Sequence, residues 1–593
     1  MADVATVLVK DSVIGDITPD LTFAVKSGAS SKTFQNFIAT SATNSNLVWN
    51  VTVPSENIVI DREVLVTSGL SFTVRVDGCS VGQVGFDYGF MDSLQAFPLA
   101  SIMTTLNAQI NNTSVSINLQ DVLPQLVAMT SKRELQRWNG MTPCLRDNTF
   151  GSYFDAMGTN ANPMAGIENT GYDECLIPRG AHPVVVNIAQ FEDDGTYVSS
   201  SPTCATLGNY FLVAVQTIVC EPLFLSPFIY AHPEFNAQGL LGVNNMVIQA
   251  NIGNLNRIFS ASPYTKNGLT ELTYTVTAGI LDGIVGVAPN SNLFQVASAE
   301  LLARVGTGGN PQLLFNFLST QPSDVIETRN SLPYMDFPRY LTPTLNGTPL
   351  APLISGAVSS SNIQLNQIPD LFIICLRKPI STMTAKDSNS FMKINSISLN
   401  LNNQSGLLSN CTPWDLWRMS VKNGSTQSWA EFSGQATNVV TAAGAGTGGG
   451  KLVGTTGSLL IINPAFDLSL PDYLSCGSIG SYNFQFNINV TNTISRDGEN
   501  IAPELVTITA NSGVFVTQQG QSQIFTGLAT KEMVLSAKSQ KDAVSSVQYL
   551  RMVGGKMLNS IGLRQSLRRQ GGERMVGGMM SGGKARGKLT ALC

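Results

Sequence analysis

The sequence predicts an all-β protein with two large sandwich or barrel domains in tandem, followed by a short helix and a basic C-terminal tail. Three observations lead to this prediction. Apolar and polar residues alternate in many segments of the 593-residue chain, as they do in strands with one buried face. Helical patterns are few and short. The length suits two domains, because all-β sandwiches often contain about 200–250 residues each.

Strand patterns occur throughout the first half of the chain. Leu47, Trp49, Val51 and Val53 lie at alternate positions and would share one face of a strand. The same alternation predicts three further strands, around Phe72/Val74/Val76, Val115/Ile117/Leu119 and Val213/Val215/Val219.

The second half shows the same periodicity. Its clearest segment is residues 483–490, NFQFNINV, in which Phe484, Phe486, Ile488 and Val490 alternate with Asn and Gln. Half-buried strands of this kind build sandwiches and barrels. Further strands are predicted around Leu272/Tyr274/Val276, Ile397/Leu399/Leu401, 505–508 and 514–516, the last two closing the second domain.

A few short helices are expected among and after these strands. The sequence predicts helices over 92–106 and 119–135, the second strained by Pro124. A third would begin at Thr412, a capping residue followed by Pro413 at the first helical position. Residues 528–544 predict a helix that leads into the tail.

The boundary between the two domains is expected in residues 260–268, SASPYTKNG, a cluster of turn-forming residues. We therefore assign residues 1–262 to the N-terminal domain, 263–530 to the C-terminal domain and 531–593 to the helix and tail. The Gly-rich run 442–451 would be a surface loop within the second domain.

The chain is poor in charge. Charged residues make up 13% of it, about half of the roughly 25% usual for soluble proteins. Such a surface stays hydrated without strong repulsion between like charges, which suits a protein that packs against copies of itself. An ordinary β-rich protein with polar loops has the same composition.

The cysteines and the apolar segments indicate a protein of a reducing compartment without a membrane span. The nine cysteines contain no C-x-x-C pair, which argues against a disulfide framework and a zinc site and favours reduced thiols. The N-terminal residues show no basic region followed by a long apolar run. The most apolar long stretch, 211–230, is broken by Gln216, Glu221, Pro222 and Pro227 and would not cross a bilayer.

The sequence predicts no catalytic centre around histidine or serine. His182 and His232 each precede a proline, which favours extended backbone and excludes a helical zinc motif. Ser80 lies in Gly78–Gly82, a match to the G-x-S-x-G pattern of serine hydrolases. That pattern needs a helix after the serine, and the residues that follow show no helical periodicity, so a Gly-rich turn is favoured.

Two other motifs also fail. A phosphate-binding loop before Lys451 would need Gly at Ala445 and Ser or Thr at Leu452. The acidic residues 192–194 lack the alternating ligand spacing of a calcium loop and are better explained as a solvated turn. We therefore predict a non-enzyme without cofactor or metal.

The most distinctive segment is the C-terminal tail, residues 551–593. It carries nine Lys or Arg against the single acid Glu573, a formal charge of +8, which leaves −13 on the rest of a chain whose total is −5. Seven of these basic residues are assigned to tail function. They are Arg564, Arg568, Arg569, Arg574, Lys584, Arg586 and Lys588.

The pattern Met-x-Gly-Gly occurs three times in this tail, at 552–555, 575–578 and 580–583. Paired glycines at this density disfavour a folded element, because glycine loses the most backbone entropy on ordering. A protease, by contrast, binds its substrate extended and accepts small residues beside the scissile bond. The tail is therefore interpreted as a cleavable basic extension, with an uncut flexible tether as the alternative.

Several short segments resemble the major capsid proteins of virophages and polinton-like DNA viruses. The first is the pair Phe97–Ile102 and Leu106–Asn111, which is similar to "FPISSI..TLNA.IN" in that family. The others follow in family order. They are 223–228, 254–259, Ile368-Pro369 before the apolar run 371–376, 401–408, Asn423-Gly424 and 429–434.

This resemblance implies two eight-stranded jelly rolls per chain, a homotrimer with six barrels as a pseudo-hexagonal capsomer, and an icosahedral virion shell. It also implies a penton protein as partner and an adenovirus-type cysteine maturation protease, which favours Met/Ile/Leu-x-Gly-Gly before the scissile bond. The predicted cuts are Gly555/Lys556, Gly578/Met579 and Gly583/Lys584.

Two questions stay open at this stage. The tail could contact the acidic bodies of neighbouring subunits, neutralise packaged DNA or guide assembly. A carbohydrate- or receptor-binding β-sandwich protein is the alternative to a coat protein, because low charge and Asn-rich strands suit it as well.

Overall fold

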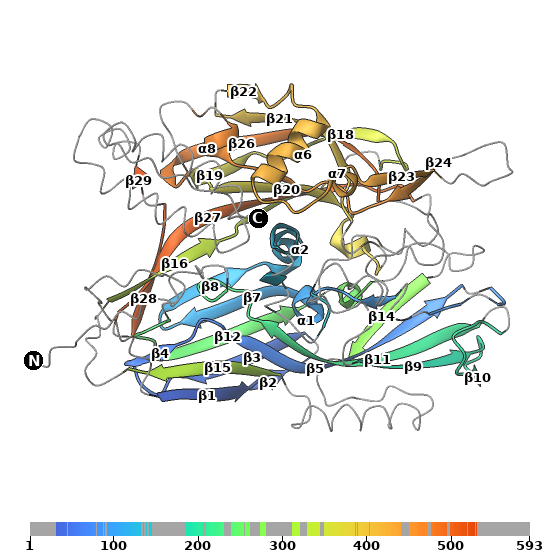
Figure 1. Ribbon diagram of the computed structural model, residues 1–593, viewed down its shortest axis with the longest axis horizontal. Coiled ribbons are helices and arrows are strands. Elements are labelled where there is room, and N and C mark those ends of the chain that lie inside the picture. Colours follow the sequence, from blue (N-terminus) through green and yellow to red (C-terminus); the bar gives the residue numbers. More distant parts are fainter. Residues whose placement is uncertain are drawn as a thin grey trace, which may run out of the picture.

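Strands dominate the computed structural model, as the alternation predicts (Figure 1). The structure describes residues 31–144, 184–229, 239–260, 273–279, 311–320, 329–343, 349–439, 450–494 and 499–530, apart from short gaps within these ranges. The predicted strand faces that carry described side chains are confirmed, except at Leu119, which begins the helix α2 (Leu119–Met129). Trp49 and Val51 are buried with Leu47 on one strand, and Phe484, Phe486, Ile488 and Val490 on another.

The first barrel is a sandwich of two sheets. In the first sheet the order is β1 (Ser31–Ile38), β15 (Gln312–Ser319), β5 (Leu65–Asp77) and β11 (Tyr210–Pro222), extended by β9 (Val184–Phe191) and β10 (Tyr197–Ser199). In the second it is β3 (Asn46–Thr52), β12 (Asn245–Ile252), β7 (Met103–Ile110) and β8 (Thr113–Ile117). Shorter strands join them: β2 (Ser41–Ala42) on β3, β4 (Ile58–Ile60) on β15, and β14 (Thr273–Gly279) on β5. β6 (Ser93–Leu94) and β13 (Phe259–Ser260) form a separate two-stranded sheet.

The second barrel repeats this arrangement. One sheet has β16 (Arg329–Asp336) and β17 (Arg339–Pro343) on β27 (Glu504–Gln518), then β20 (Leu371–Arg377) and β25 (Leu460–Ile462). The other has β18 (Ser355–Ser359) and β19 (Ile363–Gln367) on β26 (Ser478–Thr491), then β21 (Lys393–Leu401) and β22 (Gln404–Leu407). Four further strands are β23 (Gln435–Val439), β24 (Gly450–Gly454), β28 (Gln521–Thr526) and β29 (Ala529–Thr530).

Both barrels have the strand order of a jelly roll. Counting the eight principal strands of each barrel along the chain, one sheet takes the first, eighth, third and sixth, and the other takes the second, seventh, fourth and fifth. This order follows from two Greek keys folded into facing sheets. The double jelly roll implied by the sequence resemblance is thus confirmed.

The first sheet continues past residue 262, where we expected the second domain to begin. β14 pairs with β5, and β15 pairs with both β1 and β5. These strands therefore belong to the first barrel, although they follow the turn-rich cluster. Alternation identifies a strand but does not reveal which distant strand it will pair with.

The helices are short, as expected, but one is misplaced. α1 covers only Pro98–Ile102 of the predicted helix 92–106, and both flanks of that prediction are wrong. Ser93–Leu94 forms β6, and Met103–Ile110 forms β7, in which two threonines favour a strand. α2 covers Leu119–Met129 of the expected 119–135. α6 (Pro413–Lys422) begins as predicted, with Thr412 and Asp415 in a capping box. Further short helices among the described residues are α7 (Trp429–Phe432), α8 (Pro464–Asp467), η2 (Leu255–Ile258) and η4 (Ile380–Thr382).

Two expectations at the C-terminus fall largely outside the described residues. Ala529–Thr530, at the start of the predicted helix 528–544, forms β29 and pairs in parallel with β26. Residues 531–593 are not described, so the rest of that helix and the tail stay predictions. The two predicted closing strands, 505–508 and 514–516, are parts of the single long strand β27.

Candidate functional site: the junction of the two barrels

α2 of the first barrel lies between the two barrels and forms the centre of their junction (Figure 1). Leu119, Val122, Leu123 and Leu126 are buried in an apolar cluster that continues from the first barrel into the second. The helix presents polar side chains as well, and those of Asp121 and Gln125 are directed to the second barrel. One helix therefore joins both domains through apolar and polar contacts.

Pro124 lies inside α2 and lacks the N–H that would bond to the carbonyl of Gln120, four residues earlier. The guanidinium of Arg257, in η2, donates to that carbonyl oxygen instead. Burial and the neighbouring charge of Arg377 lower the pKa of Arg257 to about 10, against the opposing effect of Asp121. A buried cation thus satisfies the carbonyl that the proline leaves without its helical donor.

Asp121 is the acidic centre of the junction. Its carboxylate pairs with Arg377, at the end of β20, and with Arg339 in β17, both from the second barrel. Arg377 also donates to Glu504 through Nε at 3.1 Å and through a terminal nitrogen at 3.0 Å. Burial alone would lower the pKa of Arg377, but the neighbouring carboxylates, Asp121 above all and then Glu504, outweigh it and raise the pKa. The guanidinium therefore stays charged within the protein.

Two further contacts fix α2 against the second barrel. Gln125 Nε2 donates to Sγ of Cys375 at 3.0 Å, and burial raises the pKa of that thiol to about 12. At the end of the helix, the carbonyl oxygen of Ala128 accepts the backbone N–H of Thr426 at 3.1 Å and its hydroxyl at 2.5 Å. A second-barrel residue thus satisfies a carbonyl that the helix end would leave without a partner.

β20 is buried on both faces because it lies between the junction and the core of its own barrel. Leu371, Ile373 and Cys375 belong to the apolar cluster shared with the first barrel. Phe372, Ile374 and Leu376 belong to the separate core between the two sheets of the second barrel. This double burial explains why residues 371–376 are an unbroken apolar run and do not alternate.

The second barrel also reaches over the first with β16, β28 and the end of β27 (Figure 1). The hydroxyl of Thr517 donates to the carbonyl oxygen of Leu241 at 2.5 Å. The N–H of Gly520 donates to the carbonyl oxygen of Gly242 at 3.1 Å. The N–H of Ser522 donates to Oδ1 of Asn112 at 2.7 Å. These bonds make a second, separate line of contact between the barrels.

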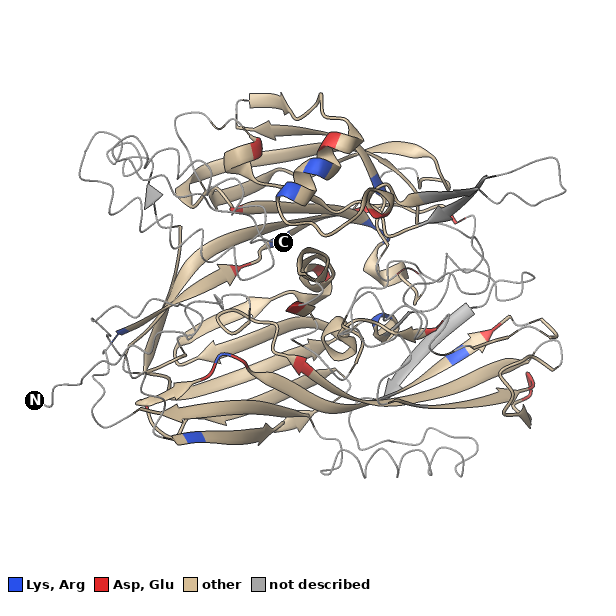
Figure 2. Ribbon diagram, in the orientation of Figure 1, with Lys and Arg blue, Asp and Glu red and all other residues tan. Residues whose placement is uncertain are grey.

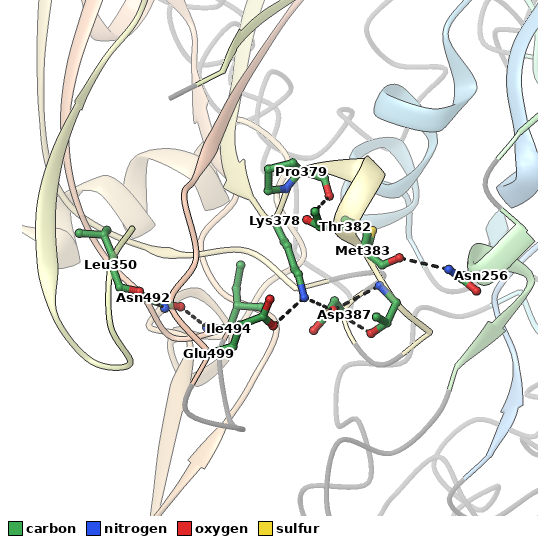
Figure 3. Close-up of polar contacts among 11 residues, drawn as sticks. Asn256, Leu350, Lys378, Pro379, Thr382, Met383, Asp387, Asn492, Ile494 and Glu499 are labelled. Carbon is green, nitrogen blue, oxygen red and sulfur yellow. Dashed lines mark hydrogen bonds and ion pairs between the residues drawn. The ribbon is translucent and has the colours of Figure 1, made fainter. Parts of the chain in front are cut away.

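A third polar group, shown in Figure 3, lies beside the junction. Lys378 Nζ pairs with Glu499 at 2.7 Å and with Asp387 at 3.2 Å. Burial would lower the pKa of Lys378, but the hydrogen bond to Glu499 and the charge of Asp387 outweigh it and raise the pKa. Nearby, Asn256 of the first barrel donates to the carbonyl oxygen of Met383 at 3.2 Å. The loop after β20 is thereby held to both barrels.

The candidate enzymatic motifs do not form a site. Among the described residues from 80 to 97 there is no helix, so Ser80 lacks the context of a hydrolase nucleophile. Lys451 lies in β24, which pairs with β23. Asp194 is in an exposed turn, where hydrogen bonds from Thr196 lower its pKa. His182 and His232 lie outside the described residues.

Metal and disulfide chemistry also find no support within the described part of the chain. No group of three or more His, Cys, Asp or Glu side chains there is placed to hold a metal ion. No disulfide joins the six cysteines whose positions are described. None of the described helices is long and apolar enough to cross a membrane. Charged residues are thinly spread over both barrels in Figure 2.

The predicted cleavage residues Gly555, Lys556, Gly578, Met579, Gly583 and Lys584, and the basic residues of the tail, lie outside the described residues and stay predictions. The junction, in contrast, was missed by sequence reasoning. Its signal is Arg377, a charged residue directly after the apolar run 371–376, and Asp121, the one charged residue of α2. Charges at such places usually have a buried partner.

Two family models match the chain, one for each barrel. Residues 2–295 match the model described as Sputnik virophage major capsid protein 1st domain. Residues 337–513 match the model described as Major capsid protein V20 C-terminal domain. The putative capsid protein V20 of Sputnik virophage is 26% identical over 555 residues, which cover 92% of this chain and 83% of that protein.

Solved structures show the same fold. A chain of the Sputnik virophage structure determined by cryo-EM aligns with a TM-score of 0.70 and 24% identity, covering 92% of this chain and 98% of that one. The mavirus major capsid protein aligns with a TM-score of 0.62 and 14% identity, covering 89% and 97%.

Proposed function

The chain belongs to the family of virophage major capsid proteins, and we propose that three copies of it form a pseudo-hexameric capsomer that tiles an icosahedral shell. Each chain would supply two of the six barrels. The protein is a structural component of the virion capsid.

The observation that carries this proposal is the rigid union of two barrels with the same strand order. Three chains can approximate sixfold symmetry only if the two barrels of each chain keep a fixed relation. The buried Asp121–Arg377 pair, the shared apolar cluster and the bonds of β27 and β28 to the first barrel support such a fixed relation.

Assembly of the purified full-length chain tests the proposal. Sedimentation velocity should give a species with three times the mass of the chain, and negative-stain images should show hexagonal particles or shells. A chain that stays monomeric at high concentration would contradict the proposal. Monomers that bind a glycan or a receptor would favour the alternative, a carbohydrate- or receptor-binding β-sandwich protein.

We further propose that an adenovirus-type maturation protease trims the tail after Gly555, Gly578 or Gly583. Support comes from the three Met-x-Gly-Gly sequences within 552–583. A cut after Gly555 would remove eight of the nine basic residues of the tail and leave Arg551. Because a peptide bond is hydrolysed and the charged fragment is released, the cut would make maturation irreversible.

The remaining partners follow from the same proposal. A penton protein would fill the fivefold positions that a pseudo-hexamer does not fit. Before cleavage, the basic tail would contact packaged DNA or the acidic bodies of neighbouring subunits. If it contacts DNA, binding should weaken steeply with salt and disappear when the chain is truncated at Arg551. We place assembly in a reducing compartment of the host cell.

A further inference from the structure

The same helix position recurs in both barrels. α2 lies between the fifth and sixth principal strands of the first barrel, β8 and β11, and α6 lies between the fifth and sixth of the second, β22 and β25. Each helix also contacts the fourth strand of its own barrel, β7 for α2 and β21 for α6. The two helices are therefore equivalent parts of one repeated arrangement. Their surroundings differ, because α2 is buried against the second barrel and α6 is partly exposed.

α2 shows which surface such a helix covers. Leu371, Ile373 and Cys375 of β20 belong to the apolar cluster that also contains α2. Val506 and Ile508 of β27 belong to it as well. These residues point away from the core between the two sheets of their own barrel. The helix thus covers the outer face of the sheet formed by the first, eighth, third and sixth strands of the neighbouring barrel.

The corresponding sheet of the first barrel presents exposed apolar residues on its outer face. Phe34 and Ile38 of β1 are 75% and 56% exposed. Phe34 lies opposite Asn316 of β15, which alternates with the core residues Phe315 and Phe317. Since opposite residues of an antiparallel pair share a face, Phe34, Asn316 and Ile38 lie on the outer side of the sheet. We call this the β1 face, and its Phe34 lacks the cover that α2 gives to β20.

α6 presents an apolar surface of its own, on the opposite side of the molecule from β1 (Figure 1). Trp414 and Val421 are 46% and 41% exposed and lie two helical turns apart, on one side of α6. The ring centroid of Trp414 is 4.6 Å from that of Trp417 and 5.0 Å from that of Trp429. The indole is therefore held in place although nearly half of it is exposed. A fixed, partly exposed tryptophan is typical of the residues that dominate protein interfaces.

The charges of the two surfaces are complementary. Arg418 and Lys422 are exposed and follow Trp414 at intervals of four residues, on the same side of α6. On the β1 face, Asn316 Nδ2 donates to Oδ2 of Asp61 at 3.0 Å. The N–H of Glu63 donates to Oδ1 of the same carboxylate at 3.2 Å, and Glu63 is exposed. Two bases of the helix would thus meet two acids of the sheet.

The junction within the chain pairs the same two kinds of surface with the opposite signs, since its acid Asp121 is on the helix and its bases are on the sheet. The other charges of the two exposed surfaces have local roles. Lys32 Nζ lies 5.1 Å from the centroid of the Phe34 ring. Asp415 caps α6 together with Thr412.

We propose that α6 of one copy packs on the β1 face of the next copy, as α2 packs on the second barrel within the chain. The repeat inside the chain identifies the occupant, because it shows this helix covering this sheet. The contact joins two different surfaces, so each copy of a closed ring gives α6 to one neighbour and receives α6 from the other. The inference rests on the proposed capsomer and names the surfaces that close it.

Phe34→Glu and Trp414→Glu test the two surfaces in the full-length chain. Each places a charge in the apolar part of the contact, so each should raise the trimer dissociation constant from sedimentation velocity by about tenfold or more. Val81→Glu is the matched control, because it adds the same charge to an exposed turn outside both surfaces and should trimerise like the wild type. Circular dichroism should show that all variants are folded. Arg418→Glu is a second α6 variant, which leaves the packing of the indole rings intact and should weaken the trimer as well.

Mixing the two variants tests the head-to-tail geometry. At a concentration where the wild type is trimeric and neither variant is, one sound contact remains in the mixture. It joins α6 of the Phe34→Glu chain to the β1 face of the Trp414→Glu chain. The mixture should therefore give a dimer with one chain of each variant and no closed trimer.

The outcomes separate this inference from the proposed function. Wild-type trimers together with equally stable Phe34→Glu and Trp414→Glu trimers would overturn the inference and leave the capsomer proposal intact. A mixture that stays monomeric would show that the two surfaces do not meet, and a dimer of either variant alone would show that a surface pairs with its own copy. Either result would overturn the inference. A wild-type chain that does not trimerise would overturn both proposals.

Discussion

Arg377 of the second barrel and Asp121 of the first form an ion pair that is almost completely buried between the barrels, with exposed side-chain fractions of 4% and 2%. A buried pair of this kind does not by itself make a protein more stable than apolar residues would. Its importance is that each charge needs the other, because an unpaired charge in the interior is very costly. The pair therefore favours one relative placement of the two barrels over others.

Asp121→Asn should lower the free energy of unfolding by about 3–5 kcal/mol, because it leaves the guanidinium of Arg377 without its main counter-charge. Urea denaturation followed by tryptophan fluorescence measures the change. Glu499→Gln serves as the control, since Glu499 pairs with Lys378 but its side chain is 51% exposed. That change should cost about 1 kcal/mol or less. Equal effects of the two substitutions would contradict the role given to the junction.

Glu221 should make the protein less stable as the pH rises. Its carboxylate accepts the backbone N–H groups of Leu99 and Ala100 at 2.9 and 2.8 Å, but burial dominates and raises the pKa to about 7. The folded state therefore holds this proton more tightly than the unfolded chain, whose pKa is near 4.5. The stability that protonated Glu221 contributes to the folded state is fully present below pH 4.5 and is lost as the pH rises to about 7.

Urea midpoints measured between pH 4.5 and pH 8 test this prediction. Burial raises the pKa of Asp370 to about 6, so Asp370 adds a loss of the same sign in an overlapping pH range. Glu221→Gln cannot ionise and should show a shallower decline than the wild type, whatever its stability at low pH. Glu192→Gln, in an exposed turn, is the control and should decline like the wild type. An unchanged slope in Glu221→Gln would refute the assignment.

Thr412→Ala should destabilise the protein by about 1 kcal/mol. The hydroxyl of Thr412 accepts the N–H of Asp415, and the carboxylate of Asp415 accepts the N–H of Thr412 at 3.1 Å, so that two free donors at the start of α6 are satisfied. Thermal unfolding of the variant measures the loss. Thr412→Ser keeps the hydroxyl and should retain most of the stability. A Ser variant as unstable as the Ala variant would show that the methyl group, not the cap, matters.

The sequence predicts local structure well in this protein because most strands have one buried face. The alternation around Trp49 and Phe484 could come only from such strands, and the cap at Thr412 is a local signal between neighbours in the chain. Where a residue's surroundings are set by distant segments, prediction fails. Residues 103–106 were assigned to a helix, although they belong to a strand that is held between β12 and β8.

The candidate site could be predicted only in part, for the same reason. The sequence predicts that Pro124 strains its helix. The residue that donates to the freed carbonyl of Gln120 is Arg257, which comes from an element far along the chain. The Asp121–Arg377 pair likewise joins two barrels whose contact no local pattern reveals. For the tail the situation is reversed. Its repeated tetrapeptides are visible in the sequence, but they lie outside the described residues, so the structure adds nothing to the prediction.

Treatment of assembled particles with the cognate maturation protease should give products that end at Gly555, Gly578 or Gly583, identified by intact-mass spectrometry. The reason is that Met-x-Gly-Gly precedes each of these positions. The tail provides its own control in Gly571-Gly572, a glycine pair preceded by Arg569-Gln570 and not by Met-x. If the methionine is recognised, the fragment 556–578 should survive intact. Cleavage after Gly572 as well would mean that the protease responds only to flexible glycine, and no cleavage at all would leave the tail as a permanent tether.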